Sequence, residues 1–346
     1  MVDNSEKEKI KPDTIPKNVF DSGIDVFTKE DFSDYLSKGN LQQNDLVGRI
    51  LEKGYNRLVS NVKTEQLAIS LGSNTLIGTM NDKEYDNAPF CSPFNMFCKY
   101  PKQRMQSLRI PWLRHGINLS TSLFSLTFKT TKFNQVIQVN NKPCDAIAYP
   151  ELSSQDVASC IQRLTSQFPH HAIIFPKLDE VTKPSLYQSL VANQFLMVPT
   201  RNVHIFHPNQ SYLKRSHTKR DFVLLKKQNY TFVSHEEMCT EDLVRMHRLY
   251  QMLFIEKHSK ENPNLTLQFF QDSHKHIWYT YFALRNADGI IDAFGSYEKQ
   301  GTLMACGPLG YDTSKDKKMG LYRMIFAQSL KIADQHDYMF NWGGGN

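Results

Sequence analysis

The residues best suited to binding a phosphate lie near the end of the sequence. Tyr311 and Asp312 precede a charged loop, and a helix is expected to begin at Lys317, Lys318 and Gly320. A helix N-terminus presents free backbone N–H groups and the positive end of a dipole, both of which favour an anion. The lysines would add charge, and Gly320 would allow close backbone approach. A packing helix beside a solvated lysine loop is the alternative on residue types alone.

Candidate catalytic residues flank this loop in the sequence. A tyrosine hydroxyl at Tyr297 or Tyr311 could relay a proton, and the Asp312 carboxylate could bind an amine. We expect Tyr311 and Asn341 at the C-terminal ends of neighbouring strands, facing the same cleft as Gly320. Ordinary strand and turn packing is the alternative for these side chains. The candidate donor-binding group consists of Lys317, Lys318, Met319 and Gly320.

The elements that position these residues form a strand–helix–strand unit. Apolar residues at helical spacing predict a helix over 319–335, without an internal proline. Strands are predicted over 302–306 before it and 338–342 after it. A helix of this kind covers one face of a sheet, so the unit indicates a mixed α/β layer.

The rest of the chain predicts two lobes with a similar order of elements. Residues 1–21 are polar and rich in charge, and we expect a flexible tail. Residues 22–205 and 206–346 each combine helices with short strands, which predicts an α/β fold with mixed sheets. One helix is predicted over 41–62, and strands over 123–128 and 146–149.

The amino-acid composition limits the kinds of protein to which this chain could belong. The 346 residues are 40% hydrophobic and 22% charged, which is typical of a globular protein with a substantial core. The net charge of +6 favours anionic ligands and is too mild to indicate a duplex-DNA binder. The six cysteines form no CxxC pair, and the sequence has neither an apolar run that could span a membrane nor a signal peptide. We therefore expect a cytoplasmic protein without a membrane span.

The sequence lacks the residue patterns that mark several kinds of functional site. The paired histidines have no cysteine or carboxylate partners at metal-binding spacing, so no metal site is predicted. Gly343-Gly344-Gly345 has no following lysine and helix, which excludes a Walker site. The basic segment 214–227 either contacts phosphate or is a solvated connecting helix. On the first reading Lys219 and Arg220 are candidate substrate contacts.

Three stretches carry a resemblance to a known family. They are Tyr212-Leu213 with Lys219-Arg220 and Lys226-Lys227, then Asn262 to Phe270, and then Gly310 to Gly345. With the order of the two lobes, they resemble the tandem acetyltransferase-like (GNAT) fold of the Fem-type peptidyltransferases. In many relatives a basic motif follows the last small-residue turn. This sequence stops at Asn346, which leads us to expect a fragment or a shortened member.

The resemblance implies transfer of an acyl or aminoacyl group to an amine. The donor would be acyl-CoA, an acyl carrier protein or an aminoacyl-tRNA, used as a co-substrate, with no tightly bound cofactor. Such transfer needs positioning and oxyanion stabilisation rather than a side-chain nucleophile, and the sequence contains no serine elbow or Cys-His signature. Two alternatives stay open. One is a non-catalytic binding protein with the same fold, and the other is an RNA-binding module that uses the basic helix.

Overall fold

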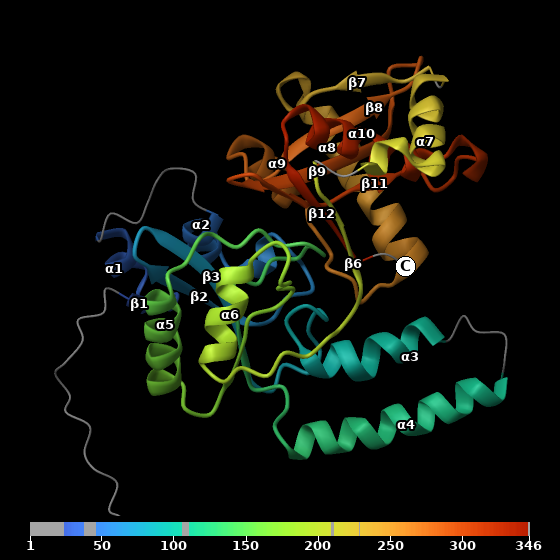
Figure 1. Ribbon diagram of the computed structural model, residues 1–346. Helices are drawn as coiled ribbons and strands as arrows, with labels where there is room; N and C mark the ends of the chain where they lie inside the picture. The colour runs from blue at the N-terminus through green and yellow to red at the C-terminus, as the bar shows by residue number, and fades with distance from the viewer. Residues whose placement is uncertain (1–23, 38–45, 106–110, 209–210, 228, 345–346) are drawn as a thin grey trace, which may run out of the picture.

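Two mixed α/β sheets organise the chain, as the computed structural model shows for residues 24–37, 46–105, 111–208, 211–227 and 229–344 (Figure 1). The tail expected over residues 1–21 lies outside these ranges. The two lobes stand side by side, and helices cover the faces of both sheets. The expected α/β class with two mixed sheets is confirmed.

The first sheet has the strand order β1-β2-β3-β4-β5, and only β4 and β5 run parallel. Its connecting helix α5 begins with a capping box, in which Ser153 and Asp156 satisfy each other's backbone N–H groups. The elements of this lobe are β1 (Ile24–Phe27), α1 (Phe32–Ser37), α2 (Leu46–Lys53), β2 (Glu65–Leu71), β3 (Asn74–Asn81), α3 (Tyr100–Met105), α4 (Pro111–Thr130), β4 (Val136–Val139), α5 (Ser154–Gln167), β5 (Ala172–Ile174) and α6 (Pro184–Ala192).

The second sheet has the order β6-β12-β10-β9-β8-β7, with β11 paired to β9. Here β10 and β12 are the parallel pair, and α10 connects them. The elements are β6 (Val203–Phe206), α7 (Ser216–Lys227), β7 (Thr231–Val233), α8 (Thr240–Tyr250), the π-helical extension η5 (Gln251–His258), α9 (Leu267–Lys275), β8 (Thr280–Arg285), β9 (Ile291–Gln300), β10 (Leu303–Cys306), β11 (Gly310–Tyr311), the short 3₁₀ turn η6 (Lys317–Met319), α10 (Leu321–Gln335) and β12 (Met339–Gly344).

The two lobes follow the same order of elements. Each has a strand, two helices, three antiparallel strands, a helix and a final parallel strand: β1 to β5 in the first lobe and β7 to β12 in the second, apart from the α3–α4 insertion and β11. The expected similarity of order is therefore present. The strand β6 precedes the predicted boundary at 205/206 for most of its length, yet it hydrogen-bonds to β12 of the second sheet. The boundary itself stays a prediction.

Two local predictions are wrong. Residues 123–128 form the end of α4 rather than a strand, and residues 146–149 are buried without forming one. The helix predicted over 41–62 is shorter, because Gly54 takes a φ of 85° and ends α2 before a 3₁₀ turn at Tyr55–Arg57. Together α3 and α4 form a helical arm that extends from the first lobe (Figure 1).

A continuous core joins the lobes. Tyr55 and Val59 of the first lobe are buried in one cluster with Leu249 and Phe270 of the second. Backbone hydrogen bonds cross the same boundary, from Thr266 N–H to the Leu58 carbonyl at 2.9 Å and from Ser60 N–H to the Asn264 carbonyl at 2.9 Å. The second-lobe segment that carries part of the family resemblance thus contacts the first lobe directly. Among the helices of the described ranges, none has the length and apolar composition needed to cross a bilayer.

Candidate functional site

The N-terminus of α10 has the geometry expected of an anion site. Gly320 adopts a left-handed conformation with φ of 67°, which permits the tight turn from η6 into the helix. The first helical hydrogen bond runs from Met324 N–H to the Gly320 carbonyl, so the preceding amides have no acceptor within the helix. Lys317 and Lys318 are exposed beside this turn. Met319 is half-buried and packs inward instead.

A network of charged side chains fixes the loop that leads to this helix. Arg245 donates to the Asp312 carboxylate at 2.7 Å, and Ser314 donates to the same group from its N–H at 3.0 Å. Burial opposes ionisation of Asp312, but the hydrogen bonds from Ser314 and Arg245 outweigh it and lower its pKa. The buried Asp292 lies 3.8 Å from Arg245 and 3.6 Å from Lys315. Asp312 therefore holds the loop in place, and its predicted role as an amine-binding group has no support from this geometry.

The basic helix α7 lies along α10. Leu224 contacts Gly320, whose added Cβ would lie 2.6 Å from Leu224 Cδ2, and Arg323 pairs with Asp221. Because residue numbers rise on one helix as they fall on the other, the two helices run antiparallel. Lys226 and Lys227 therefore continue toward the N-terminal end of α10.

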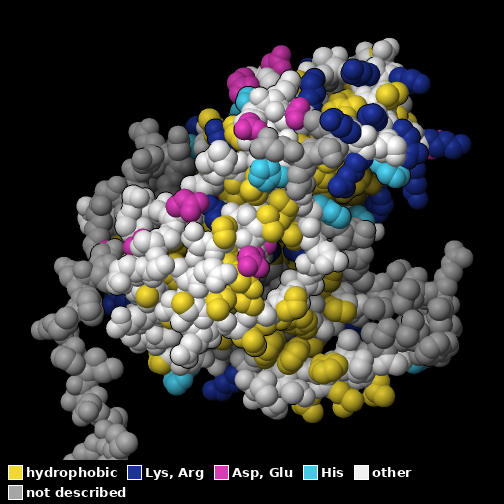
Figure 2. Space-filling model, viewed as in Figure 1, with side chains coloured by type: hydrophobic (Ala, Val, Ile, Leu, Met, Phe, Trp, Pro, Cys, Tyr) yellow, Lys and Arg dark blue, Asp and Glu magenta, His cyan; other side chains and the backbone are white. Residues whose placement is uncertain are grey.

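The predicted contacts Lys219 and Arg220 lie earlier on α7 and therefore further from the N-terminus of α10. Both are exposed, and Arg220 contacts His217 at 2.8 Å. Figure 2 shows lysine and arginine side chains gathered over this part of the second lobe. The sequence thus located the basic surface, but the geometry favours Lys226 and Lys227 for a ligand at the start of α10.

Tyr311 lies close to this region without reaching a common cleft with Asn341. The Lys257 ammonium donates to the Tyr311 hydroxyl at 2.7 Å, and the Tyr311 ring lies 6.4 Å from that of Tyr322 on α10. Trp342, on β12, packs on the same side, with its ring 5.1 Å from Phe326. Tyr311 therefore faces α10.

Asn341 points to the opposite face of the sheet. Side chains alternate along a strand, so Asn341 faces away from its neighbour Trp342 and toward the first lobe. There its amide donates to Asp179 at 3.2 Å, and its oxygen accepts from Gly343 N–H at 2.8 Å. The expectation that Tyr311 and Asn341 face the same cleft is thus wrong, because Tyr311 on β11 packs beside α10 while Asn341 on β12 contacts the first lobe.

The parallel strands β10 and β12 part near these residues. They are hydrogen-bonded as far as the pair Ala305–Asn341. Beyond it, the chain after β10 turns toward β9, where Tyr311 pairs with Ala293, while β12 continues along β6 through Gly343. The parting strands and the start of α10 occupy the same end of the second sheet, because α10 follows the C-terminal end of β10.

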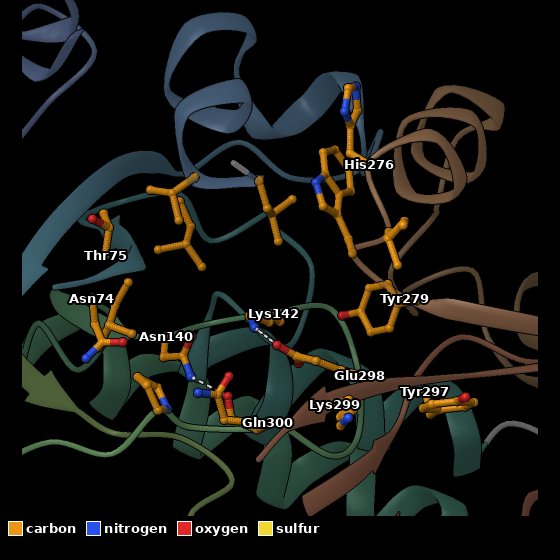
Figure 3. Close-up of a pocket in the computed structure, with 18 of the residues that line it drawn as sticks. Asn74, Thr75, Asn140, Lys142, His276, Tyr279, Tyr297, Glu298, Lys299 and Gln300 are labelled. Carbon is orange, nitrogen blue, oxygen red and sulfur yellow. Dashed lines mark hydrogen bonds and ion pairs between the residues drawn. The ribbon is translucent and has the colours of Figure 1, made fainter. Parts of the chain in front are cut away.

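A cleft of about 500 Å³ lies between the lobes at the other end of this sheet. It is bounded by both lobes, and Figure 3 shows the side chains that line it. Its lining residues come from the starts of α2, β3 and β8, the end of β9 and two loops: Leu46, Val47, Asn74–Ile77, Asn140, Lys142, Ala148, Pro150, 276–280 and 297–300.

An ion pair across the lobe boundary forms part of this cleft. Lys142 of the first lobe contacts the Glu298 carboxylate of the second, and the two side chains are only 13% and 17% exposed. Figure 3 shows the two groups pointing toward each other. Removing one partner would leave the other charge poorly solvated, so the pair favours one arrangement of the lobes.

Two tyrosines line the same cleft. The Tyr279 hydroxyl lies 3.1 Å from Cys144 Sγ, and burial raises the pKa values of both groups, that of Cys144 to about 12. Burial also raises the pKa of Tyr297, the third predicted catalytic residue. Tyr311 pairs with Ala293, four residues before Tyr297 on β9, so the two tyrosines are about 13 Å apart along the strand. The predicted catalytic residues therefore do not form one constellation.

The sequence analysis did not identify Lys177, a half-buried lysine beside the cleft. Lys177 Nζ donates to the carbonyls of Lys142, at 2.8 Å, and Cys144. Burial lowers the pKa of Lys177 to about 8, against the nearby Asp145 carboxylate, which raises it. A lysine with such a pKa exchanges its proton near neutral pH and is a candidate for a functional role. Its location depends on segments that pack together only in the folded chain, and no local pattern marks it.

The comparisons with known proteins give only loose structural likenesses. No protein-family model matches the sequence, and no curated protein is similar to it. The structure of FemX is similar with a TM-score of 0.45 and 8% identity, over 83% of this chain and 80% of that one. The structure of L-PGS from Bacillus licheniformis matches with a TM-score of 0.42 and 15% identity over 55% of this chain.

A third similar structure is the C-terminal domain of a putative lysylphosphatidylglycerol synthetase from Agrobacterium fabrum, with a TM-score of 0.42 and 12% identity. This chain spans 57% of the Bacillus structure and 61% of the Agrobacterium one. At these scores the likeness assigns no activity to this chain.

Proposed function

We propose that this protein transfers an acyl or aminoacyl group from a phosphate-bearing carrier to an amine. The observation that carries the proposal is the unit of β10, α10 and β12. Its two parallel strands part at the end where α10 begins, and Lys317 and Lys318 flank the uncapped helix N-terminus there. This arrangement supports a phosphate site beside the point where the two strands diverge, and the extended arm of a carrier would reach the sheet there.

The positions of the charged groups indicate where the carrier, the acyl group and the acceptor would each bind. The start of α10 would bind the carrier phosphates, with Lys226 and Lys227 adding positive charge from α7. The acyl group would lie between the parting strands, where precise placement supplies much of the rate enhancement. The amine acceptor would approach from the first lobe, past Asn341 and Asp179. CoA, a carrier protein and tRNA all present phosphates and fit this scheme.

The separation of Tyr311 from Asn341 favours a second candidate function. Tyr311 faces α10, whereas Asn341 faces the first lobe, so the two cannot act on one reacting group. A binding protein with the same two lobes requires no such convergence. It would bind the phosphate-bearing ligand without transferring a group.

Carrier binding can be measured by calorimetry with CoA and with tRNA. Replacing both Lys317 and Lys318 by Glu should weaken binding by about 1–3 kcal/mol, because the two exposed charges adjoin the helix N-terminus. The matched control changes Lys275 and Lys331 to Glu. Both are exposed and distant from the start of α10, with Lys275 at the end of α9 and Lys331 one turn before the end of α10.

The control alters the net charge equally and should leave the affinity within about twofold. Equal weakening in both double variants would show that only the overall charge matters. Failure of the wild-type protein to bind either carrier would remove the proposed phosphate site.

A further inference from the structure

The helical arm α3–α4 exposes an apolar stripe that the fold does not cover. Leu119, Leu123 and Leu126 follow one another at helical spacing on α4 and are 66%, 63% and 65% exposed. Phe124 is exposed as well, but it lies on the side of α4 that carries Phe128, whose ring is 6.2 Å away. Such contiguous exposure of large apolar side chains is unusual on a soluble surface and marks a contact surface. Figure 2 shows apolar side chains along the edge of the arm, away from the two lobes.

A different face of α4 holds the arm on the first lobe. The Phe128 ring lies 4.4 Å from that of Phe133 and 6.4 Å from that of Phe97. Lys129 lies over the rings of Tyr85 and Phe94, at 5.4 and 5.6 Å. The arm is therefore anchored without using the leucine stripe, which leaves that stripe available for a partner.

The charged residues in and around the arm indicate which kind of partner the stripe suits. Between Asn87 and Cys144 the sequence contains no Asp or Glu, although it contains eight Lys and Arg residues. Lys102 on α3 and Lys132 just after α4 are exposed. In the described residues, acidic side chains that contact the base of the arm are engaged: Asp86 pairs with Lys63 and Lys99, Glu261 accepts from Asn95, and Asp82 accepts from Gln135. An exposed apolar stripe on a segment that carries cations and no acidic residue of its own suits a surface that is both apolar and anionic.

We propose that the arm binds an anionic lipid surface, with the stripe of Leu119, Leu123 and Leu126 inserted at the headgroup boundary. An amphipathic helix lies in the plane of such an interface, and its affinity grows with the apolar area buried and with attraction between its cations and anionic lipids. The arm is suited to this position because it extends from the lobes as a separate hairpin (Figure 1). A protein partner would equally cover the leucines, but it would not require the absence of acidic residues along the whole segment.

The proposal is tested by sedimentation of the full chain with two kinds of vesicle. One kind is phosphatidylcholine alone, and the other contains phosphatidylcholine and phosphatidylglycerol in equal parts. We expect binding to the anionic vesicles that weakens as salt is added. Changing Leu119, Leu123 and Leu126 to Gln should reduce this binding roughly tenfold or more, because the inserted apolar area is lost.

Control variants distinguish binding by the arm from non-specific binding through other exposed apolar side chains and from the effect of net charge. Val181, Leu196 and Val198 are comparably exposed elsewhere on the first lobe, so their triple Gln variant should bind as the wild type does. Lys102→Glu with Lys132→Glu should reduce binding to anionic vesicles roughly tenfold. The same change at Lys275 and Lys331 should leave binding nearly unaltered. Circular dichroism should show that every variant keeps the wild-type fold.

Three outcomes would overturn the proposal. They are failure of the wild-type protein to bind anionic vesicles, unchanged binding of the leucine variant, and loss of binding only when Lys226 and Lys227 of α7 are replaced by Glu. Sedimentation without vesicles adds a fourth test. A wild-type dimer that the leucine variant converts to a monomer would show that the stripe joins two copies of the chain.

Discussion

Lys177 shows how much a single residue depends on the assembled fold. It adopts a φ of 58°, which is unusual for a residue other than glycine, and its ammonium lies among the carbonyls of Lys142 and Cys144. The Phe90 ring lies 5.8 Å from its nitrogen. These surroundings satisfy the charge only in part, which is why the pKa of Lys177 falls to about 8.

This pKa predicts how stability depends on pH. Below pH 8 Lys177 is charged in both the folded and the unfolded chain, and the cost of burying the charge is fully present. Between its folded pKa of about 8 and its ordinary value of 10.5, only the unfolded chain keeps the proton. The free energy of unfolding of the wild type, relative to Lys177→Met, should therefore rise with pH across this interval, by up to about 3 kcal/mol.

Denaturant titrations of both proteins at several pH values give this difference directly. The lost hydrogen bonds from Lys177 to the two carbonyls lower the stability of the variant at every pH, so only the slope is diagnostic. Curves that stay parallel through this interval would show that Lys177 does not titrate abnormally.

The limits of prediction from sequence are clearest for individual residues. The pattern around Lys317, Lys318 and Gly320 identified the start of a helix correctly, because capping and charge are local properties. The directions in which the Tyr311 and Asn341 side chains point could not be predicted from the sequence, since they depend on where β10 and β12 part. The Lys142–Glu298 pair joins residues 156 positions apart and leaves no local signal.

At the scale of elements, the close contact of β11 with the helices on the face of the sheet determines the path to α10. Gly310 lies against the junction of α8 and η5, where an added Cβ would meet Tyr250 N at 2.8 Å and the Leu249 carbonyl carbon at 2.9 Å. These are backbone atoms that cannot turn aside. Glycine is therefore required at this position by space rather than by its own backbone angle.

Gly310→Ala should lower the free energy of unfolding by about 1–3 kcal/mol, because β11 or η5 must shift to relieve the overlap. Gly116→Ala is the matched control, since an added Cβ in α4 meets nothing within 4 Å. It should stabilise the protein by up to about 1 kcal/mol through the unfolded chain. Thermal and urea unfolding measure both effects. A Gly310 variant as stable as the wild type would mean that the packing at this junction is looser than the structure indicates.

The helices and strands were predictable where a strong period extended over many residues. The helix over 319–335 and the strands around it agree with α10, β10 and β12 within a few residues. The segment 123–128 was wrongly predicted as a strand, because Phe124, Leu126 and Phe128 alternate with Ser125 and Thr127 as they would in a strand. The helix α4 begins twelve residues before this segment, and a short alternating run cannot reveal that.

For the whole molecule, the two lobes form one unit because their interface is part of the core. Val59 and Leu265, both fully buried, form a backbone bridge between the lobes, and β6 joins the second sheet from the end of the first lobe. These contacts favour one arrangement of the parting strands, the interlobe cleft and Asn341. The proposed transfer between a carrier and an acceptor on different lobes would require such an arrangement.

The proposed function requires that an acyl group moves from a carrier to an amine. The most direct measurement follows a radiolabelled acyl group from charged tRNA or from acyl-CoA into a mixture of free amines, peptides and aminolipids. We expect the wild type to transfer label to an amine, and the Lys317→Glu, Lys318→Glu double variant to do so about tenfold more slowly or worse. The Lys275→Glu, Lys331→Glu control should match the wild type. Carrier binding without any transfer of label would contradict the claim and leave the binding function.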